Sequence, residues 1–330
     1  MSSIGILNSL LTRAHSIIAK FLTKEQLELL LSAKDLDQLK TAFLQTSYGA
    51  IIAPYDFENQ LSEVARALKR SYANMILSFY RQSSMDIKNK IVQFTERYHI
   101  ENIRIIIHGK FVERTKKEIL DRIVELPRYS LNYYSTLIDK EIIEIINMQK
   151  GDFKEVLLEG YNEFKETGNF VALESVIDQH LYSSLLKISP QYKVYVNMKN
   201  IVALCRAIVL GIPPYRYLLP NKFISKALNE KSVRRVLEVY KYGPYKDVFS
   251  RFLQESGEIP IDQLEFAIEK YQTRMWIKLF RNRTLGSFDN LIGFFELKLA
   301  ETMDLIRIIV GINAGLDKGS IKETLVFYNF

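Results

Sequence analysis

Four histidines and one cysteine are the residues of this chain best suited to metal binding or nucleophilic catalysis. They are His15, His99, His108, His180 and Cys205. Imidazole and thiolate groups ligate zinc or act as base and nucleophile, but such sites usually show close spacing, as in H-E-x-x-H or C-x-x-C. No two of these five residues have that spacing, and His99 and His108 flank different turns of one expected helix. The sequence therefore predicts no metal site.

Other signatures of catalysis are also missing from the sequence. It contains no G-x-x-x-x-G-K-[ST] or G-x-G-x-x-G loop for a nucleotide, and no G-x-S-x-G nucleophile elbow. Carboxylates four residues apart, such as Glu155 and Glu159, are typical of a solvated helix surface. Cys205 lies in an apolar segment, where a buried and inert thiol is favoured over a nucleophile. We predict no catalytic residue, no cofactor and no small-molecule substrate, so the chain is not expected to be an enzyme.

A polar pair inside an apolar run needs a different explanation. Residues 300–315 read A-E-T-M-D-L-I-R-I-I-V-G-I-N-A-G, which places Asp304 and Arg307 among aliphatic residues. Two further segments, starting at Asn102 and Asn200, continue with Ile and carry Gly or Ala at the eighth position. The three starts lie 98 and 104 residues apart. Segments that are apolar nearly all round are typical of buried helices.

The elements around these segments are predicted to be helices as well. Apolar residues recur at steps of three and four, as in residues 58–81, and alternating strand patterns are scarce. Capping boxes at Thr23–Gln26 and Ser320–Glu323 indicate helix starts, while Gly49 and Gly211 indicate helix ends. We predict an all-α protein built from three diverged copies of one helical unit. The predicted units are residues 1–125, 126–225 and 226–330.

Six polar positions belong to the repeated segments: Asn102, Arg104, Asn200, Arg206, Asp304 and Arg307. Polar groups in a buried helix need partners, so we interpret these residues as contacts that build the fold. Contact with a partner protein is the alternative for the same residues.

Composition and charge bound the function without selecting it. The net charge is +7, from 45 basic and 38 acidic residues that are interleaved along the chain. The apolar stretches fall below the ~20 residues of a membrane-spanning helix, and one cysteine allows no internal disulfide, which favours a reducing compartment. Nineteen Tyr and nineteen Phe leave open a basic helical-repeat protein that binds nucleic acid. A scaffold of an unrelated complex is the other alternative.

Several segments together resemble a known family. They are N-S-L-L-T-R-A-H-S-I-I-A-K-F-L-T-K-E-Q-L-E-L-L-L (8–31), L-Q-T-S-Y-G (44–49), E-N-I-R-I-I-I-H-G-K (101–110), M-K-N-I-V-A-L-C-R-A-I-V-L-G (198–211), E-T-M-D-L-I-R-I-I-V-G (301–311) and I-K-E-T-L-V (321–326). In their order they are similar to the C subunit of the archaeal and bacterial A-type/V-type rotary ATPases, whose eukaryotic counterpart is the V-ATPase d subunit. The resemblance covers the whole chain.

The resemblance implies a funnel of three helical subdomains around a pseudo-threefold axis. It also implies a non-catalytic central-stalk adaptor at the cytoplasmic face of the membrane, peripheral to it and present in one copy per complex. The expected partners are the central-shaft subunits and the membrane proteolipid ring, with no nucleic acid. Torque would pass through the adaptor and link ATP turnover to proton or sodium transport.

The repeat register also suggests which loops meet a partner. We expect the loops at corresponding ends of the three units, residues 110–114, 212–217 and 313–318, to gather around the funnel. The residues expected to face a partner there are Lys110, Arg114, Tyr215, Arg216, Asp317 and Lys318.

Overall fold

The computed structural model describes residues 3–125, 129–212, 218, 223–254, 257–282 and 287–328. Within these ranges the chain forms helices joined by turns and loops, and no strand, which confirms the all-α prediction. The chain divides by internal contacts into two compact units. Unit 1 comprises Met1–Thr95, Lys117–Asn132 and Thr273–Phe330; unit 2 comprises Glu96–Lys116 and Tyr133–Gln272. The division into three sequence repeats stays a prediction.

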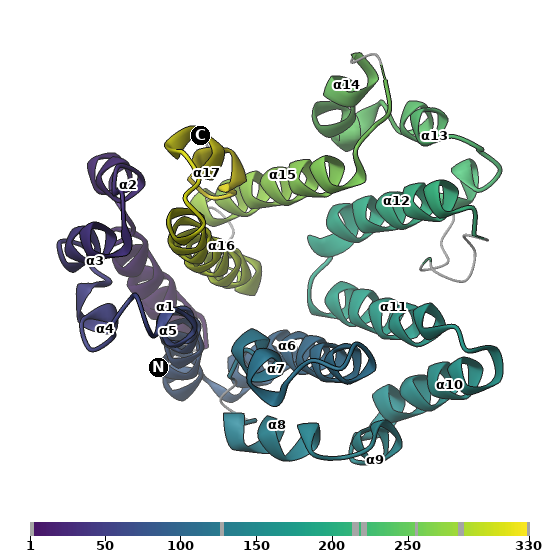
Figure 1. The fold of residues 1–330 in the computed structure, drawn as a ribbon, viewed down its shortest axis with the longest axis horizontal. Helices are drawn as coiled ribbons and strands as arrows, with labels where there is room; N and C mark the ends of the chain where they lie inside the picture. The colour runs from purple at the N-terminus through teal and green to yellow at the C-terminus, as the bar shows by residue number, and fades with distance from the viewer. Residues whose placement is uncertain are drawn as a thin grey trace. The chain divides into compact units, whose positions relative to one another are not determined.

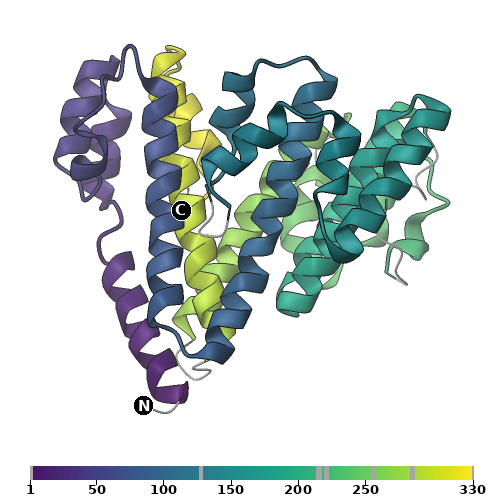
Figure 2. The same cartoon turned by 90° about the horizontal axis from the view of Figure 1, so that it is seen from below.

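Unit 1 is built around the long helix α16 (Phe288–Asn313), which runs beside α5 (Leu61–Gln82), as Figure 2 shows. The remaining helices of the unit lie around these two (Figure 1). They are α1 (Ser3–Ile18), α2 (Lys24–Leu31), α3 (Leu36–Leu44), α4 (Gly49–Ile52), α7 (Lys116–Arg122) and α17 (Lys318–Thr324), with the first part of α6 (Met85–Phe111) and the last part of α15 (Ile261–Arg281).

The core of unit 1 explains the apolar run in residues 300–315. Leu305, Ile308 and Ile309 of α16 are fully buried in one cluster with residues of α2 to α5 and α17. A second part of the same helix carries Phe294 and Phe295, whose rings pack against Phe79 of α5 at centroid distances of 5.3 and 5.5 Å. Because α16 meets neighbours on nearly all sides, its sequence has no polar face.

Unit 2 has a comparable core around α12 (Tyr192–Leu210). Ile201, Leu204 and Cys205 are fully buried there, in a cluster with Phe249 and Leu264. The other elements of the unit are α8 (Leu131–Ile138), α9 (Ile142–Asn147), α10 (Gly151–Thr167), α11 (Phe170–Ile188), α13 (Val233–Val239), α14 (Lys246–Gln254) and the short 3-10 helices η2 (Ile224–Ala227) and η3 (Gly243–Tyr245), with the remainders of α6 and α15.

Two of the sequence signals for helix ends are confirmed. The Thr23 hydroxyl accepts from the amide of Gln26 at 3.2 Å, and the Gln26 side chain accepts from the amide of Thr23 at 3.1 Å, which is the expected capping box before α2. Gly211 ends α12 in the left-handed conformation, with φ of 66°, which only glycine adopts without strain.

Two other signals were wrong. The N-cap of α17 is Asp317 and not Ser320, because the Asp317 carboxylate accepts from the amides of Gly319 and Ser320 at 2.8 and 3.0 Å. A carboxylate acceptor three residues earlier takes over the role expected of the Ser320 hydroxyl. Gly49 begins α4 and does not end a helix. Glycine is needed there because a Cβ atom would lie 2.8 Å from the Leu44 carbonyl oxygen in the tight connection from α3.

The close approach of α10 and α11 gives a first prediction. A Cβ atom at Gly160 would lie 3.1 Å from the Cα atom of Leu173 and would also collide with the Val176 side chain. The backbone of α11 cannot yield easily, so Gly160→Val is expected to destabilise the chain by about 1–3 kcal/mol. Denaturant unfolding measures the change. Glu159→Val, at the exposed neighbouring position on the same helix, is the control and should change stability little; equal stability of the two variants would contradict the packing.

Candidate functional site

Asp304 is a completely buried carboxylate on α16 that holds the last described residues of the chain. Its two oxygens accept from the backbone amides of Val326, at 2.9 and 3.1 Å, of Phe327, at 2.7 Å, and of Tyr328, at 3.0 Å. Arg307, one turn further along α16, contacts the same carboxylate at 2.9 Å. Burial raises the pKa of Asp304, whereas the amides and Arg307 act in the opposite direction. The carboxylate thus anchors the C-terminal segment to the core of unit 1.

A second buried carboxylate on α16, Glu301, connects both ends of the chain. It accepts from the Tyr328 hydroxyl at 2.6 Å and from the Lys298 ammonium at 2.9 Å. The Tyr328 hydroxyl in turn accepts from the amide of Leu22 at 2.9 Å, and Lys298 also donates to the Tyr48 hydroxyl at 2.6 Å. Burial and the neighbouring Glu301 carboxylate raise the pKa of Tyr328, so its hydroxyl stays protonated and keeps donating. Every charge in this cluster has a partner, as a buried ion pair requires.

The Lys298–Glu301 pair was not predicted from the sequence. The spacing of Lys298 and Glu301 could have predicted this pair, because lysine and glutamate three residues apart in an apolar helix lie on one face and can pair. The partners Tyr48, Tyr328 and the Leu22 amide lie far away in sequence and leave no local pattern.

In unit 2, two of the six polar positions named from the repeats, Arg104 and Arg206, line one groove of about 390 Å³. Arg104 of α6 contacts Asp178 of α11 at 2.7 Å, and Arg206 of α12 contacts Glu265 of α15 at 2.7 Å. The charged residues of the groove are Arg104, Lys199 and Arg206 together with Glu174, Asp178 and Glu265. Three positive and three negative side chains leave little net charge with which to attract a small ion. The ion pairs instead join helices that are distant in sequence.

The other predicted polar positions are distributed over both units. Asn102 and Asn200 are buried in unit 2, whereas Asp304 and Arg307 lie together in unit 1. The structure therefore places Arg104 and Arg206 on the same groove and pairs Asp304 with Arg307. That all six are equivalent positions of a repeat stays a prediction.

Among the residues expected to face a partner, three make contacts within the chain. Lys110 donates to the carbonyl of Ile138 at 2.9 Å, Asp317 caps α17, and Lys318 contacts Glu28 of α2 at 2.6 Å. The side chain of Arg114 makes no hydrogen bond or ion pair with any described residue. Tyr215 and Arg216 lie outside the described residues.

The histidines are engaged separately. His99 lies between Tyr134, at 3.1 Å, and Gln149, at 2.9 Å; His108 contacts Glu174 at 2.7 Å; His180 stacks on Phe153 and His15 packs against Phe280. In the part of the chain that the structure describes, no three His, Cys, Asp or Glu side chains are placed to hold a metal ion. None of the described helices combines the length and the apolar character needed to cross a membrane.

These observations define an all-helical protein whose described polar clusters join segments that lie far apart in the sequence. A family model described as ATP synthase (C/AC39) subunit matches residues 10–324. The chain belongs to this family and is a non-catalytic subunit of a rotary ATPase.

Curated relatives agree with this family, and the three that follow are all C subunits of A-type ATP synthases. The relative from Methanocaldococcus jannaschii is 22% identical, over 95% of this chain and 84% of the relative. The one from Methanosarcina mazei is 24% identical, over 96% of this chain and 91% of the relative. That of Haloferax volcanii is 26% identical, over 72% of this chain and 73% of the relative. The similarity therefore extends over nearly the whole chain.

Removing the Asp304 carboxylate should release the C-terminal segment. Asp304→Ala leaves three backbone amides and Arg307 without their acceptor, so we expect a loss of about 3–5 kcal/mol in unfolding free energy. Asp304→Asn, which retains one acceptor oxygen, should lose less. Hydrogen exchange of residues 326–328 should become faster in both variants. Asp37→Ala, at an exposed position of α3, is the control; unchanged exchange in Asp304→Ala would refute the anchor.

Burial makes the single thiol unreactive. Cys205 is fully buried, and desolvation raises its pKa to about 12, so almost no thiolate forms near neutral pH. A thiol reagent such as DTNB should fail to label the native chain at about pH 8, near the ordinary thiol pKa, and should label it once urea unfolds it. Above that ordinary pKa folding becomes less favourable, because only the unfolded chain gains by ionising the thiol. Rapid stoichiometric labelling of the folded chain would contradict this burial.

Proposed function

We propose that this chain is the central-stalk adaptor of its rotary ATPase, a socket that receives the central shaft and rests on the membrane proteolipid ring. The observation that carries the proposal is the family match over residues 10–324, with C subunits of A-type ATP synthases as relatives along nearly the whole chain. On this proposal the chain is peripheral to the membrane at its cytoplasmic face and present in one copy per complex.

Torque transmission is the mechanism, and it needs stiffness instead of chemistry. Within the described ranges, four helices are longer than twenty residues, α5, α6, α15 and α16, and both units have dense apolar cores. Close-packed interiors resist compression and transmit strain. The groove pairs of unit 2 hold together helices that the sequence separates widely. The buried carboxylates Glu301 and Asp304 of α16 bind segments from both ends of the chain. Rotation driven by ATP hydrolysis can then turn the ring and move protons or sodium, and in synthesis the direction reverses.

Exposed apolar side chains near the ends of three helices favour the proposal that these ends contact partner proteins. They are Phe111 and Val112 at the end of α6, Val209 and Leu210 at the end of α12, and Val310 and Leu316 near the end of α16. These ends adjoin the loops 110–114, 212–217 and 313–318 that the repeat register assigns to a partner. Exposed apolar residues that cluster beside polar ones are typical of protein interfaces.

Copurification tests the proposal. The chain, tagged in its native host and extracted by gentle solubilisation of membranes, is expected to bring down the central-shaft subunits and a small, very hydrophobic ring protein. Recovery of the chain alone, or with nucleic acid, would leave the fold intact and refute the adaptor function.

A surface variant locates the interface more finely. Val209 is 65% exposed, so Val209→Ser should leave the melting temperature unchanged. If the end of α12 meets the shaft, the loss of an apolar contact of ~1 kcal/mol should lower recovery of shaft subunits about fivefold. Tyr242→Ser, at a 73% exposed position outside these three loops, is the control. Equal recovery with both variants would exclude this helix end from the interface.

A further inference from the structure

Unit 1 contains a cavity that the adaptor function does not use. Its volume is about 440 Å³, within the range of roughly 300–1,000 Å³ typical of ligand pockets. Helices α1, α15 and α16 and the segment after α17 form its walls. The wall residues that matter are His15, Ile18, Ile277, Arg281, Leu297 and Phe327.

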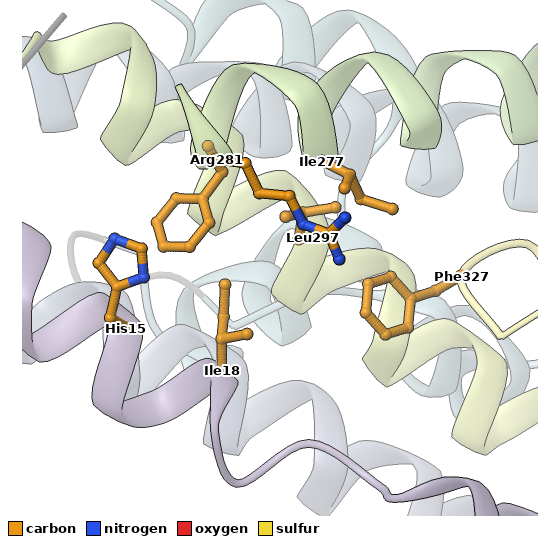
Figure 3. A pocket seen from close by; sticks show the side chains of 7 residues that line it. His15, Ile18, Ile277, Arg281, Leu297 and Phe327 are labelled. Atoms are coloured by element: carbon orange, nitrogen blue, oxygen red, sulfur yellow. The ribbon is translucent and has the colours of Figure 1, made fainter. Parts of the chain in front are cut away.

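Apolar side chains supply most of the wall. Figure 3 shows Ile18 of α1 on one side and Ile277 of α15 on the other, with Leu297 between them and Phe327 at one end. None of the described residues that line the cavity is acidic. A ligand that buries methylene groups here gains free energy by removing them from water.

The positive charge of Arg281, which lines the cavity, has no counterpart within the described residues. The Arg281 guanidinium forms no hydrogen bond or ion pair with any of them, and the His15 ring makes only its contact with Phe280, at 4.4 Å. Arg104, Arg206 and Arg307, by contrast, each contact a carboxylate. Arginine stays charged at all physiological pH values and offers a fork of donors that suits a carboxylate or a phosphate.

We propose that this cavity binds the apolar chain of an amphiphile whose anionic head group pairs with Arg281. The charge of Arg281 selects an anion, and the apolar side chains around it select a hydrocarbon chain. A peptide fits poorly, because its backbone amide groups would need several acceptors, and among the described lining side chains only that of His15 can accept. The proposal stands independently of the adaptor function.

Calorimetric titration of the full chain with dodecanoate, below its micelle concentration, tests the site. We expect saturable binding at one site, weakened about tenfold by Arg281→Gln, since one charge-assisted hydrogen bond is lost. Arg274→Gln removes the same charge from the same helix outside the cavity, so it should bind like the unmodified chain. Ile277→Trp fills the cavity and should abolish binding, and melting temperatures establish that each variant is folded.

Three results would overturn the proposal: no saturable binding, equal binding by Arg281→Gln and Arg274→Gln, or full binding by Ile277→Trp. A photoreactive residue in the assembled complex, Ile18→p-benzoylphenylalanine, adds a further arm. Its crosslinking to a polypeptide would overturn the lipid assignment, and its crosslinking to a lipid would support it.

The source of the amphiphile is resolved with vesicles. A membrane phospholipid would be assigned if the chain cosediments with phosphatidylglycerol vesicles but not with phosphatidylcholine vesicles. Arg281→Gln should then lose this cosedimentation, and Arg274→Gln should keep it. Dodecanoate binding without cosedimentation would assign a free fatty acid. Both results support the site, because each requires the same cavity and the same guanidinium.

Discussion

Burial of α16 on nearly all sides is the constraint on which unit 1 depends. A helix in that position cannot leave a charge unpaired, since an isolated buried carboxylate or ammonium is far too costly. Asp304, Glu301 and Lys298 are nevertheless placed on it, and their partners come from both ends of the chain. The apolar contacts of α16 are not directional, whereas these polar contacts fix which segments must meet it. The same helix therefore supplies the core and the connections of the termini.

The fold class could be predicted because it follows from local periodicity and end signals. Spacing of three and four in the apolar residues, the Thr23 capping box and Gly211 all report backbone geometry within a few residues. The same signals failed where a competing group was close by. Asp317 caps α17 in place of Ser320, and Gly49 serves a tight connection instead of a helix end. Local patterns rank the possible caps but do not decide between neighbours.

The polar sites were predictable only in part. Asp304 stands out in the sequence, but the groups that satisfy it are backbone amides, which are the same for every residue type. Arg104 and Arg206 could be named, yet Asp178 and Glu265 could not be assigned to them because each pair spans more than fifty positions. A single sequence shows which residues need a partner, but it does not show where in the chain that partner lies.

In a non-catalytic subunit of a rotary ATPase, an arginine can stabilise the fold or meet a partner. Arg104, Arg206 and Arg307 stabilise the fold through their ion pairs. Arg114 adjoins the exposed apolar residues Phe111 and Val112 at a helix end, where we propose contact with a protein partner. Arg281 adjoins a concave apolar wall instead. Broad exposed surfaces suit protein partners, whereas a concave wall of aliphatic and aromatic side chains suits a hydrocarbon chain. On the two proposals, Arg114 and Arg281 therefore meet different kinds of partner.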